Sequence, residues 1–336
     1  MSHRRLPLLA AALFTCTSTY AITIGGGGDA KEVDLSQTFD IAADRAASAK
    51  PYIVARGTPK GIKRVAIASF CVGAVYGKGV SGVSKGGTLT FSKSATSGFP
   101  GGLPGGELLL AAEAMRQQLE ASFTAAGIEV VPYEQLAAMP AFQKFAQRMV
   151  TEPQLVDEDL DLGKGKDGQQ LLAIFSPGQR PFLKDCRQPN PATQMAKAKL
   201  AFEKEMAGIN LVSAVVTMDF AKPLAGGGFF SGAKADLKYG QFIAAGITNN
   251  NLEFTGTGGG TLWLKQAIVA AQNPFTEGGK GAVKRKGEYD WLRGTSTTTT
   301  TQSTTIDADH ELWATNAQSH MKALAEMYVA ALTAAK

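Results

Sequence analysis

Cysteine, histidine and long hydrophobic runs are all scarce in this sequence. The 336 residues include only 3 cysteines and 3 histidines. Because a structural zinc site needs a cluster of these residues, we expect no metal site and no other cofactor. The longest apolar run, residues 6–14, falls short of the roughly 20 residues that a membrane-spanning helix requires. The sequence therefore predicts no transmembrane helix.

An excess of one charge is also lacking. The formal net charge is +5, and it falls to +3 when Arg4 and Arg5 are removed with the N-terminal segment described below. A surplus this small argues against a nucleic-acid partner. The densest basic cluster, Lys280 with residues 284–286, is followed by Glu288 and Asp290. This mixture is typical of a solvated loop, and an anion site is the alternative.

The N-terminus has the pattern of a secretory signal. Arg4 and Arg5 precede the apolar run, and small residues then lead to Thr19-Tyr20-Ala21, which fits a signal-peptidase site. Residues 1–21 are therefore predicted to be a signal peptide, and the protein is predicted to be exported to the periplasm or held at the outer membrane. Cys16 gives a second interpretation, because residues 13–16 resemble a lipoprotein cleavage site, although Thr15 departs from that pattern. Lipidation of Cys16 would tether the chain to a membrane.

Two cysteines remain after this signal, Cys71 and Cys186. An oxidising compartment allows them to form a disulfide, but the sequence alone does not show that they meet. The alternative is a pair of buried thiols.

The pattern of the mature chain predicts an α/β fold with a mixed sheet covered by helices. Strands and helices alternate in the first half, and a run of antiparallel strands fills the second half. The clearest helix carries an apolar stripe at Leu108, Ala112, Met115, Leu119 and Phe123. The best strand covers residues 211–220, and a long helix closes the chain. Residues 295–305, rich in threonine, are predicted to be an exposed strand or a linker.

Glycine divides the chain into segments. Residues 22–60 begin with four glycines and are predicted to be a tether followed by a poorly patterned segment, with the ordered core starting near Lys63. Residues 61–336 are predicted to be one domain. Within it, residues 77–106 form a glycine-rich insert, with an edge strand or hairpin arm at residues 88–92.

The layout of residues 63–335 resembles the bacterial envelope family that includes the N-terminal domain of TolB, LpoB and CsgG. The resemblance lies in the opening strand at residues 63–70, the helix–glycine–strand unit at 113–133, the strand at 210–220 and the meander at 233–270. It consists of patterns of apolarity and turns rather than particular side chains. It implies a non-enzymatic role in the envelope, either binding another protein or assembling into a complex. CsgG-like members form an oligomeric pore from inserted hairpins, but only residues 88–92 approach the alternation that such a strand needs.

Two motifs suggest catalysis or nucleotide binding. Residues 77–82 fit G-x-G-x-x-G, but the expected helix and acidic residue do not follow. Residues 82–86 fit G-x-S-x-G, which would make Ser84 the nucleophile of a periplasmic serine hydrolase, with His310 or His320 as its base. That motif requires a strand before the serine and a helix directly after it. His320 also fits an apolar stripe and is expected to be a core or boundary residue.

Three aromatic residues on glycine-rich loops are the candidate binding residues. Phe229 and Phe230 lie between glycines, and Phe99 lies within the other glycine-rich segment, residues 77–106. Such side chains either contact a partner or fold back onto the sheet. The sequence thus predicts a non-catalytic envelope interaction protein that binds an envelope partner or associates with itself. The alternatives are the hydrolase using Ser84 and a CsgG-like outer-membrane assembly.

Overall fold

The computed structural model describes residues 31–57, 59–86, 88–99, 105–146, 151–161, 166–177, 206, 208–228, 232–256 and 258–334. Five helices lie in these ranges: α1 (Arg45–Tyr52), α2 (Gly105–Ala125), α3 (Tyr133–Ala137), α4 (Pro140–Ala146) and α6 (His310–Ala334). The strands are β1 (Ile53–Arg56), β2 (Arg64–Gly86), β3 (Leu89–Gly98), β4 (Glu129–Val130), β5 (Gln154–Asp161), β6 (Lys166–Phe175), β7 (Asn210–Gly228), β8 (Gly232–Ile243), β9 (Asn250–Thr255), β10 (Gly260–Leu264), β11 (Ile268–Val269), β12 (Phe275–Lys280), β13 (Lys284–Asp290) and β14 (Thr295–Ala308).

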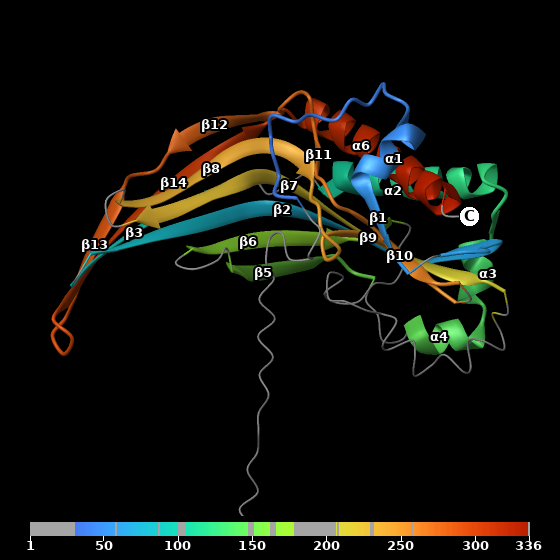
Figure 1. Cartoon of the computed structure of the whole chain (residues 1–336), viewed down its shortest axis with the longest axis horizontal. Coiled ribbons are helices and arrows are strands. Elements are labelled where there is room, and N and C mark those ends of the chain that lie inside the picture. The colour runs from blue at the N-terminus through green and yellow to red at the C-terminus, as the bar shows by residue number, and fades with distance from the viewer. Residues whose placement is uncertain are drawn as a thin grey trace, which may run out of the picture.

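All fourteen strands belong to one mixed sheet, as the sequence predicted in outline. Its main path runs β1-β10-β9-β7-β2-β3-β14-β12, with parallel pairs between β2 and β7 and between β3 and β14. The helices gather at one end of this sheet, and the strands arch away from them toward β13 at the other end (Figure 1). Most of the core is therefore provided by strands rather than by helices.

Two helices form the main cover of the sheet. The predicted stripe of α2 is confirmed, since all five of its residues are fully buried. The long C-terminal helix α6 packs beside α2 and buries Trp313, Ala317, Leu324 and Tyr328. Helix α6 begins after Asp309, whose carboxylate accepts the N–H of Leu312, as an N-cap does. A separate cluster around Leu136 and Phe142 places α3 and α4 against Ala66 and Ala68 of β2.

The ordered core begins earlier than the sequence indicated. Phe39 is 3 % exposed and packs edge-on against Tyr52, and β1 pairs antiparallel with β10. Helix α1 starts at Arg45, where Asp44 accepts the N–H groups of Ala46 and Ala47. Residues 31–57 are therefore part of the folded body, although their sequence has little periodicity.

The glycine-rich insert is mostly strand rather than loop. Strand β2 continues through Gly86 and pairs antiparallel with β3 over ten residue pairs, from Gly77–Gly98 to Gly86–Leu89. The threonine-rich segment is also a strand, β14, parallel to β3. Together with β5, β6 and β13 these strands form a six-stranded region in the order β5-β6-β2-β3-β14-β13, which we call the distal sheet.

The β7–β8 hairpin lies against the distal sheet with very close backbone contact. A Cβ atom on Gly82 of β2 would overlap the carbonyl oxygens of Lys234 and Gly226. A Cβ on Gly227 of β7 would overlap the carbonyl oxygen of Val83. The two strand layers can therefore touch only because these positions are glycine. Assigning the glycine-rich segment to a loop does not predict this close contact.

Replacing Gly82 should separate these layers. We expect Gly82→Ala to lower the free energy of unfolding by about 2 kcal/mol, because the new methyl group meets backbone that cannot rotate away. Gly226→Ala is the matched control, since a Cβ there meets nothing within 4 Å. Urea unfolding followed by circular dichroism measures both. Equal stability of the two variants would show that the layers do not touch at Gly82.

Candidate functional site: a buried polar row and two charged sheet edges

The two longest strands separate at a buried ion pair. Strands β2 and β7 pair in parallel as far as Ala74 and Met218. Beyond that point β7 shifts its register with β8 between Asp219 and Ala221, and β2 shifts its register with β6 between Val75 and Gly77. These irregularities lie side by side and let the β7–β8 hairpin leave the plane of the distal sheet.

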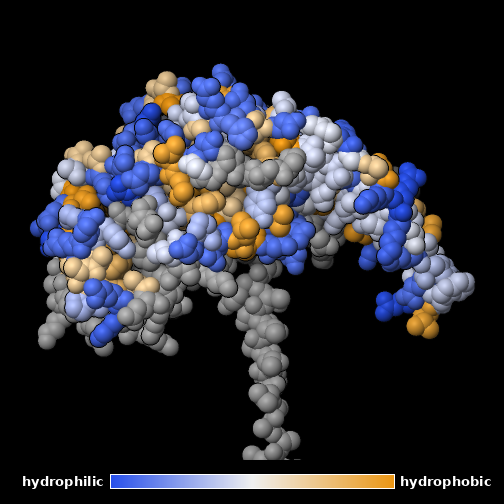
Figure 2. All heavy atoms as spheres, turned by 180° about the vertical axis from the view of Figure 1, so that it is seen from behind, coloured by the Kyte–Doolittle hydropathy of each residue, from blue (hydrophilic) through white to orange (hydrophobic). Residues whose placement is uncertain are grey.

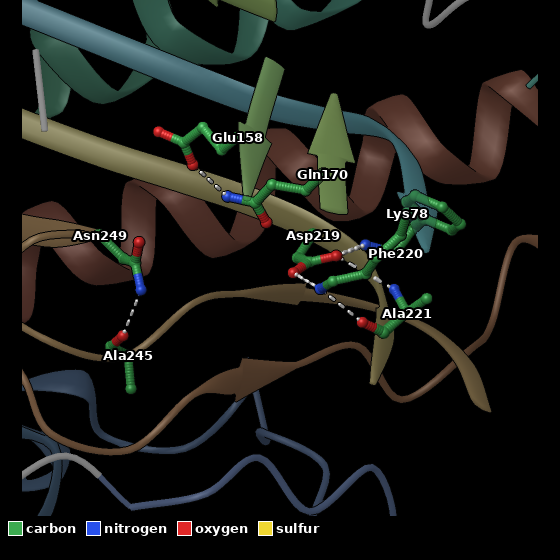
Figure 3. A network of polar contacts seen from close by, with 8 residues as sticks. All are labelled: Lys78, Glu158, Gln170, Asp219, Phe220, Ala221, Ala245 and Asn249. Atoms are coloured by element: carbon green, nitrogen blue, oxygen red, sulfur yellow. Dashed lines mark hydrogen bonds and ion pairs between the residues drawn. The ribbon is translucent and has the colours of Figure 1, made fainter. Parts of the chain in front are cut away.

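Lys78 and Asp219 join the strands at this branch point. The ammonium of Lys78 donates to Asp219 Oδ2 and to the carbonyl oxygen of Ala221, the latter at 2.8 Å. Asp219 Oδ1 accepts the N–H groups of Phe220 at 2.8 Å and Ala221 at 3.2 Å (Figure 3). The side chains of Lys78 and Asp219 are only 1 % and 7 % exposed. The ammonium of Lys78 and the carboxylate of Asp219 thus compensate each other's charge, and their ion pair links β7 to β2.

The residues that lie level with Lys78 on the neighbouring strands β6 and β5 are also polar. Glu158 of β5 lies opposite Gln170 of β6, which lies opposite Lys78. Gln170 Nε2 donates to Glu158 Oε2 at 2.9 Å, and both side chains are buried (Figure 3). Asp219 already accepts three hydrogen bonds, and the amide of Gln170 does not ionise near neutral pH, so it is neither an acid nor a base there. This arrangement favours fixing the strands over acid–base chemistry.

A hollow of about 350 Å³ lies beside this row. Gly77, Gly79 and Gly98 line the hollow. Lys78 also lines it, and the ammonium of Lys78 donates to Asp219. The remaining lining residues are Tyr76, Thr96, Ser97, Phe99, Gln169, Leu171, Ser303, Thr304 and Thr305. Most of the exposed lining surface is apolar, although hydroxyl and amide groups of Thr96, Gln169 and Ser303 border it, and the lining contains no nucleophile–base pair.

The structure does not bring Ser84 to a histidine. Ser84 lies inside β2 and is followed by another strand, whereas a nucleophile elbow needs a helix there. Through Phe91 of β3, the register places Ser84 level with Thr298 of β14. His310 follows the far end of β14, and ten residues of strand span about 33 Å. The same continuous strand contains the G-x-G-x-x-G match at residues 77–82, so no helix follows it either.

His320 lies in the core, where its surroundings do not favour a catalytic base. It is 2 % exposed, its ring faces Phe39 at a centroid distance of 6.3 Å, and its Nε2 has no partner among the described residues. Burial lowers the pKa of His320 from 6.5 to about 4, and a hydrogen bond to the backbone of Asn316 opposes this shift only in part. The expectation of a core histidine is confirmed.

The three candidate aromatic residues divide into two groups. Phe99 folds back onto the sheet, with its ring 4.9 Å from Phe220 and 5.5 Å from Phe275. Of the two alternatives, partner contact and folding back onto the sheet, the structure shows the second for Phe99. Phe99 also lines the hollow. Phe229 and Phe230 lie outside the described residues, and their binding role stays a prediction.

Of the three cysteines, the structure describes only Cys71. Cys71 is fully buried in β2 and is disulfide-bonded. Cys186 and Cys16 lie outside the described residues, as does the predicted signal peptide, so the Cys71–Cys186 pairing and the lipidation of Cys16 stay predictions. No helix among the described residues is long and apolar enough to cross a membrane. Over the same residues, no group of three or more metal-binding side chains occurs.

No family model, no curated protein and no solved structure matches this chain. The function must therefore be argued from the geometry alone. The feature that distinguishes this sheet is the character of its two outer strands, which the sequence did not single out.

One outer strand of the distal sheet is acidic. Strand β5 carries Asp157, Glu158, Asp159 and Asp161 and no basic residue. Among the described residues it pairs only with β6, so its other edge is open there. Asp157 and Asp159 are exposed, and Leu155 beside them is 76 % exposed.

The opposite outer strand is basic at its start. Strand β13 begins Lys284-Arg285-Lys286 and pairs only with β14 within the described part of the chain. All seven of its residues are exposed, which means that neither face of this strand is covered. Within the described part of the chain, the outer edges of β5 and β13 therefore present unpaired backbone N–H and C=O groups to a partner strand.

Proposed function

We propose that this protein is a non-catalytic cell-envelope protein that assembles head to tail with further copies of itself through β5 and β13. The observation that carries the proposal is that the distal sheet ends on one side in an acidic strand and on the other in a strand whose first three residues are basic, with Lys286 also paired to Glu288 at 2.6 Å. An open strand edge offers backbone donors and acceptors that a second chain can pair with. Because the two edges differ, the contact is heterologous and generates a ring or a filament.

The positions of the charges support this pairing. Register and the two-residue period of strands place Asp157 and Asp159 on the same face of the distal sheet as Lys284 and Lys286. If β13 of one copy continued the sheet beyond β5 of the next with Lys284 level with Asp157, Lys286 would lie level with Asp159 and these four side chains would project side by side. The same register sets Glu288 level with Asp161. Opposite charges on neighbouring strands stabilise the pairing, and like charges oppose it.

The two edges are staggered along the strand direction. Strands β5 and β13 run in the same direction, and they overlap at one row only, where Lys284 lies level with Asp161. The register that sets Lys284 level with Asp157 therefore shifts each copy by four residues, from 161 to 157, over the six strands.

Location and partners belong to the same proposal. The predicted signal peptide supports export to the periplasm or the outer membrane, where the complex would form. The resemblance to the TolB, LpoB and CsgG family supports a binding or assembly role rather than catalysis. The geometry around Ser84 gives the hydrolase no comparable support.

A charge-swap experiment tests the assembly. We expect the exported protein to form an oligomer in light scattering coupled to size-exclusion chromatography at low salt. Asp157→Lys/Asp159→Lys gives a chain with two basic edges, and Lys284→Glu/Lys286→Glu gives one with two acidic edges. Each variant alone should assemble about 100-fold more weakly, because like charges then meet across the contact. A mixture of the two variants should assemble again.

The mixture separates this contact from unfolding, since misfolded variants would not rescue each other. Leu110→Lys, which changes an exposed residue of α2 outside both edges, is a control that should leave assembly unchanged. A wild-type protein that stays monomeric at all concentrations would refute the proposal. Assembly of both variants at the wild-type concentration would do so as well.

A further inference from the structure

The hairpin that joins β13 to β14 ends in hydrophobic side chains held in solvent. Trp291 is 86 % exposed and Leu292 is 99 % exposed, the two highest values among the exposed large hydrophobic residues that the structure describes. Tyr289 is 52 % exposed, and its ring contacts that of Trp291 at 4.7 Å. A soluble surface rarely presents such residues together at the end of a projection, so the cluster indicates a contact site.

The turn that presents these residues is ordered by its own hydrogen bonds. Asp290 Oδ1 accepts the N–H groups of Leu292 at 3.0 Å and Arg293 at 3.2 Å. Gly294 then adopts a φ of +62°, which favours glycine, and leads into β14. Trp291 and Leu292 are thus held outward by a formed turn, and binding through them needs little further ordering.

The hairpin as a whole has a basic excess, which lies along β13 rather than at the turn, where Glu288 pairs with Lys286 and Asp290 with Arg293. Residues 280–293 contain five basic and two acidic side chains, a net charge of +3, against +5 for the whole chain. Lys284, Arg285 and Lys286 follow one another on an uncovered strand, so both faces of the hairpin carry positive charge. Figure 2 shows this hairpin as a narrow projection in which hydrophilic and hydrophobic residues lie side by side.

We propose that this hairpin end docks on an anionic phospholipid surface. Tryptophan and tyrosine prefer the boundary between headgroups and acyl chains, and leucine at the apex reaches the apolar region below it. The lysines and arginine of β13 lie further along the hairpin, from where they attract negatively charged lipids over a range that salt limits. A protein partner would need a pocket for the apex, whereas a bilayer accepts a narrow projection without one. The contact is peripheral, because the hairpin inserts only its turn.

The three tryptophans of the chain provide a direct measurement. Trp263 and Trp313 are buried, 7 % and 3 % exposed, so Trp291 is the one in contact with solvent. We expect its emission to shift to shorter wavelength when the exported protein is added to vesicles of phosphatidylcholine and phosphatidylglycerol. Vesicles of phosphatidylcholine alone should give a much smaller shift, and salt should weaken the binding.

Variants identify the groups responsible. Trp291→Ser/Leu292→Ser should lower the vesicle partition coefficient, measured by co-sedimentation, at least tenfold, because the apolar apex is lost. Lys284→Gln and Arg285→Gln should each lower it roughly fivefold on anionic vesicles only. Leu110→Ser is the matched control, since it removes an exposed leucine from α2, outside the hairpin and both edges, and should leave the partition coefficient unchanged.

The outcomes are distinct from those of the assembly test. Asp157→Lys/Asp159→Lys, which should prevent assembly, should still bind vesicles, so failure of one proposal leaves the other testable. Undiminished binding of the Trp291→Ser/Leu292→Ser variant would overturn the lipid contact. A concentration-dependent shift of Trp291 emission without vesicles, seen in the Asp157→Lys/Asp159→Lys variant that should not assemble through β5, would overturn it too and would assign the apex to a contact between copies.

Discussion

Lys78→Met is expected to lower the free energy of unfolding by about 3–5 kcal/mol, among the largest effects of any single substitution in the described part of the chain. The methionine keeps the length of the side chain but removes its charge, and it leaves the buried carboxylate of Asp219 without its cation. An uncompensated buried charge costs this much because neither water nor a second cation reaches it. Urea unfolding followed by circular dichroism gives the value.

The comparison variants separate charge from packing. Lys85→Met changes an exposed lysine of the same strand and should cost less than about 0.5 kcal/mol. The double variant Lys78→Met/Asp219→Leu removes both charges and should recover much of the loss, since an apolar pair fits a buried site as well as an ion pair does. If Lys78→Met and Lys85→Met were equally stable, the pair would not hold β7 to β2.

This ion pair bears on the proposed assembly through geometry. The sheet divides into two layers at Lys78 and Asp219, and beyond that point β7 no longer pairs with β2, whose freed edge pairs with β3. Strand β3 in turn aligns β14, which aligns β13. The branch point therefore determines where the basic edge lies. A weakened Lys78–Asp219 pair should disturb assembly without altering any residue of β5 or β13.

The regular parts of the fold were predictable because their side chains follow the period of their structure. The apolar stripes of α2 and α6 have helical spacing, and residues 211–220 form a continuous apolar run, which now lies within β7. A break before Pro140 divides α3 from α4, since proline cannot continue a helix. These signals are local, and each is carried by neighbouring residues in one segment.

The rest depended on contacts between distant segments. Gly82 and Gly227 are typical of a loop when taken alone, yet here they allow two strand layers to touch. Lys78 is typical of an exposed position, and only Asp219, 141 residues later, explains its burial. The acidic and basic edges were likewise hidden, because nothing local shows that residues 154–161 and 284–290 are the outer strands of one sheet.

Acidification is expected to destabilise the protein through His320. The folded protein holds this imidazole neutral, with its pKa lowered to about 4, whereas the unfolded chain takes up the proton near pH 6.5. Between these values the unfolded state binds more protons, so the free energy of unfolding falls as the pH falls from 6.5 to 4. The total loss is roughly 3 kcal/mol, on the basis of about 1.4 kcal/mol for each pH unit of the shift. Below pH 4 this contribution should level off.

The contribution of His320 is isolated by difference, because carboxylates also titrate in this range. His320→Phe keeps an aromatic ring against Phe39 and should have a shallower pH dependence than wild type between pH 6.5 and 4. His310→Gln, which changes the exposed histidine at the start of the same helix, should follow the wild-type curve. Parallel curves for wild type and His320→Phe would mean that His320 takes up its proton equally in both states. The burial of His320 against Phe39 would then not contribute to the loss of stability in acid.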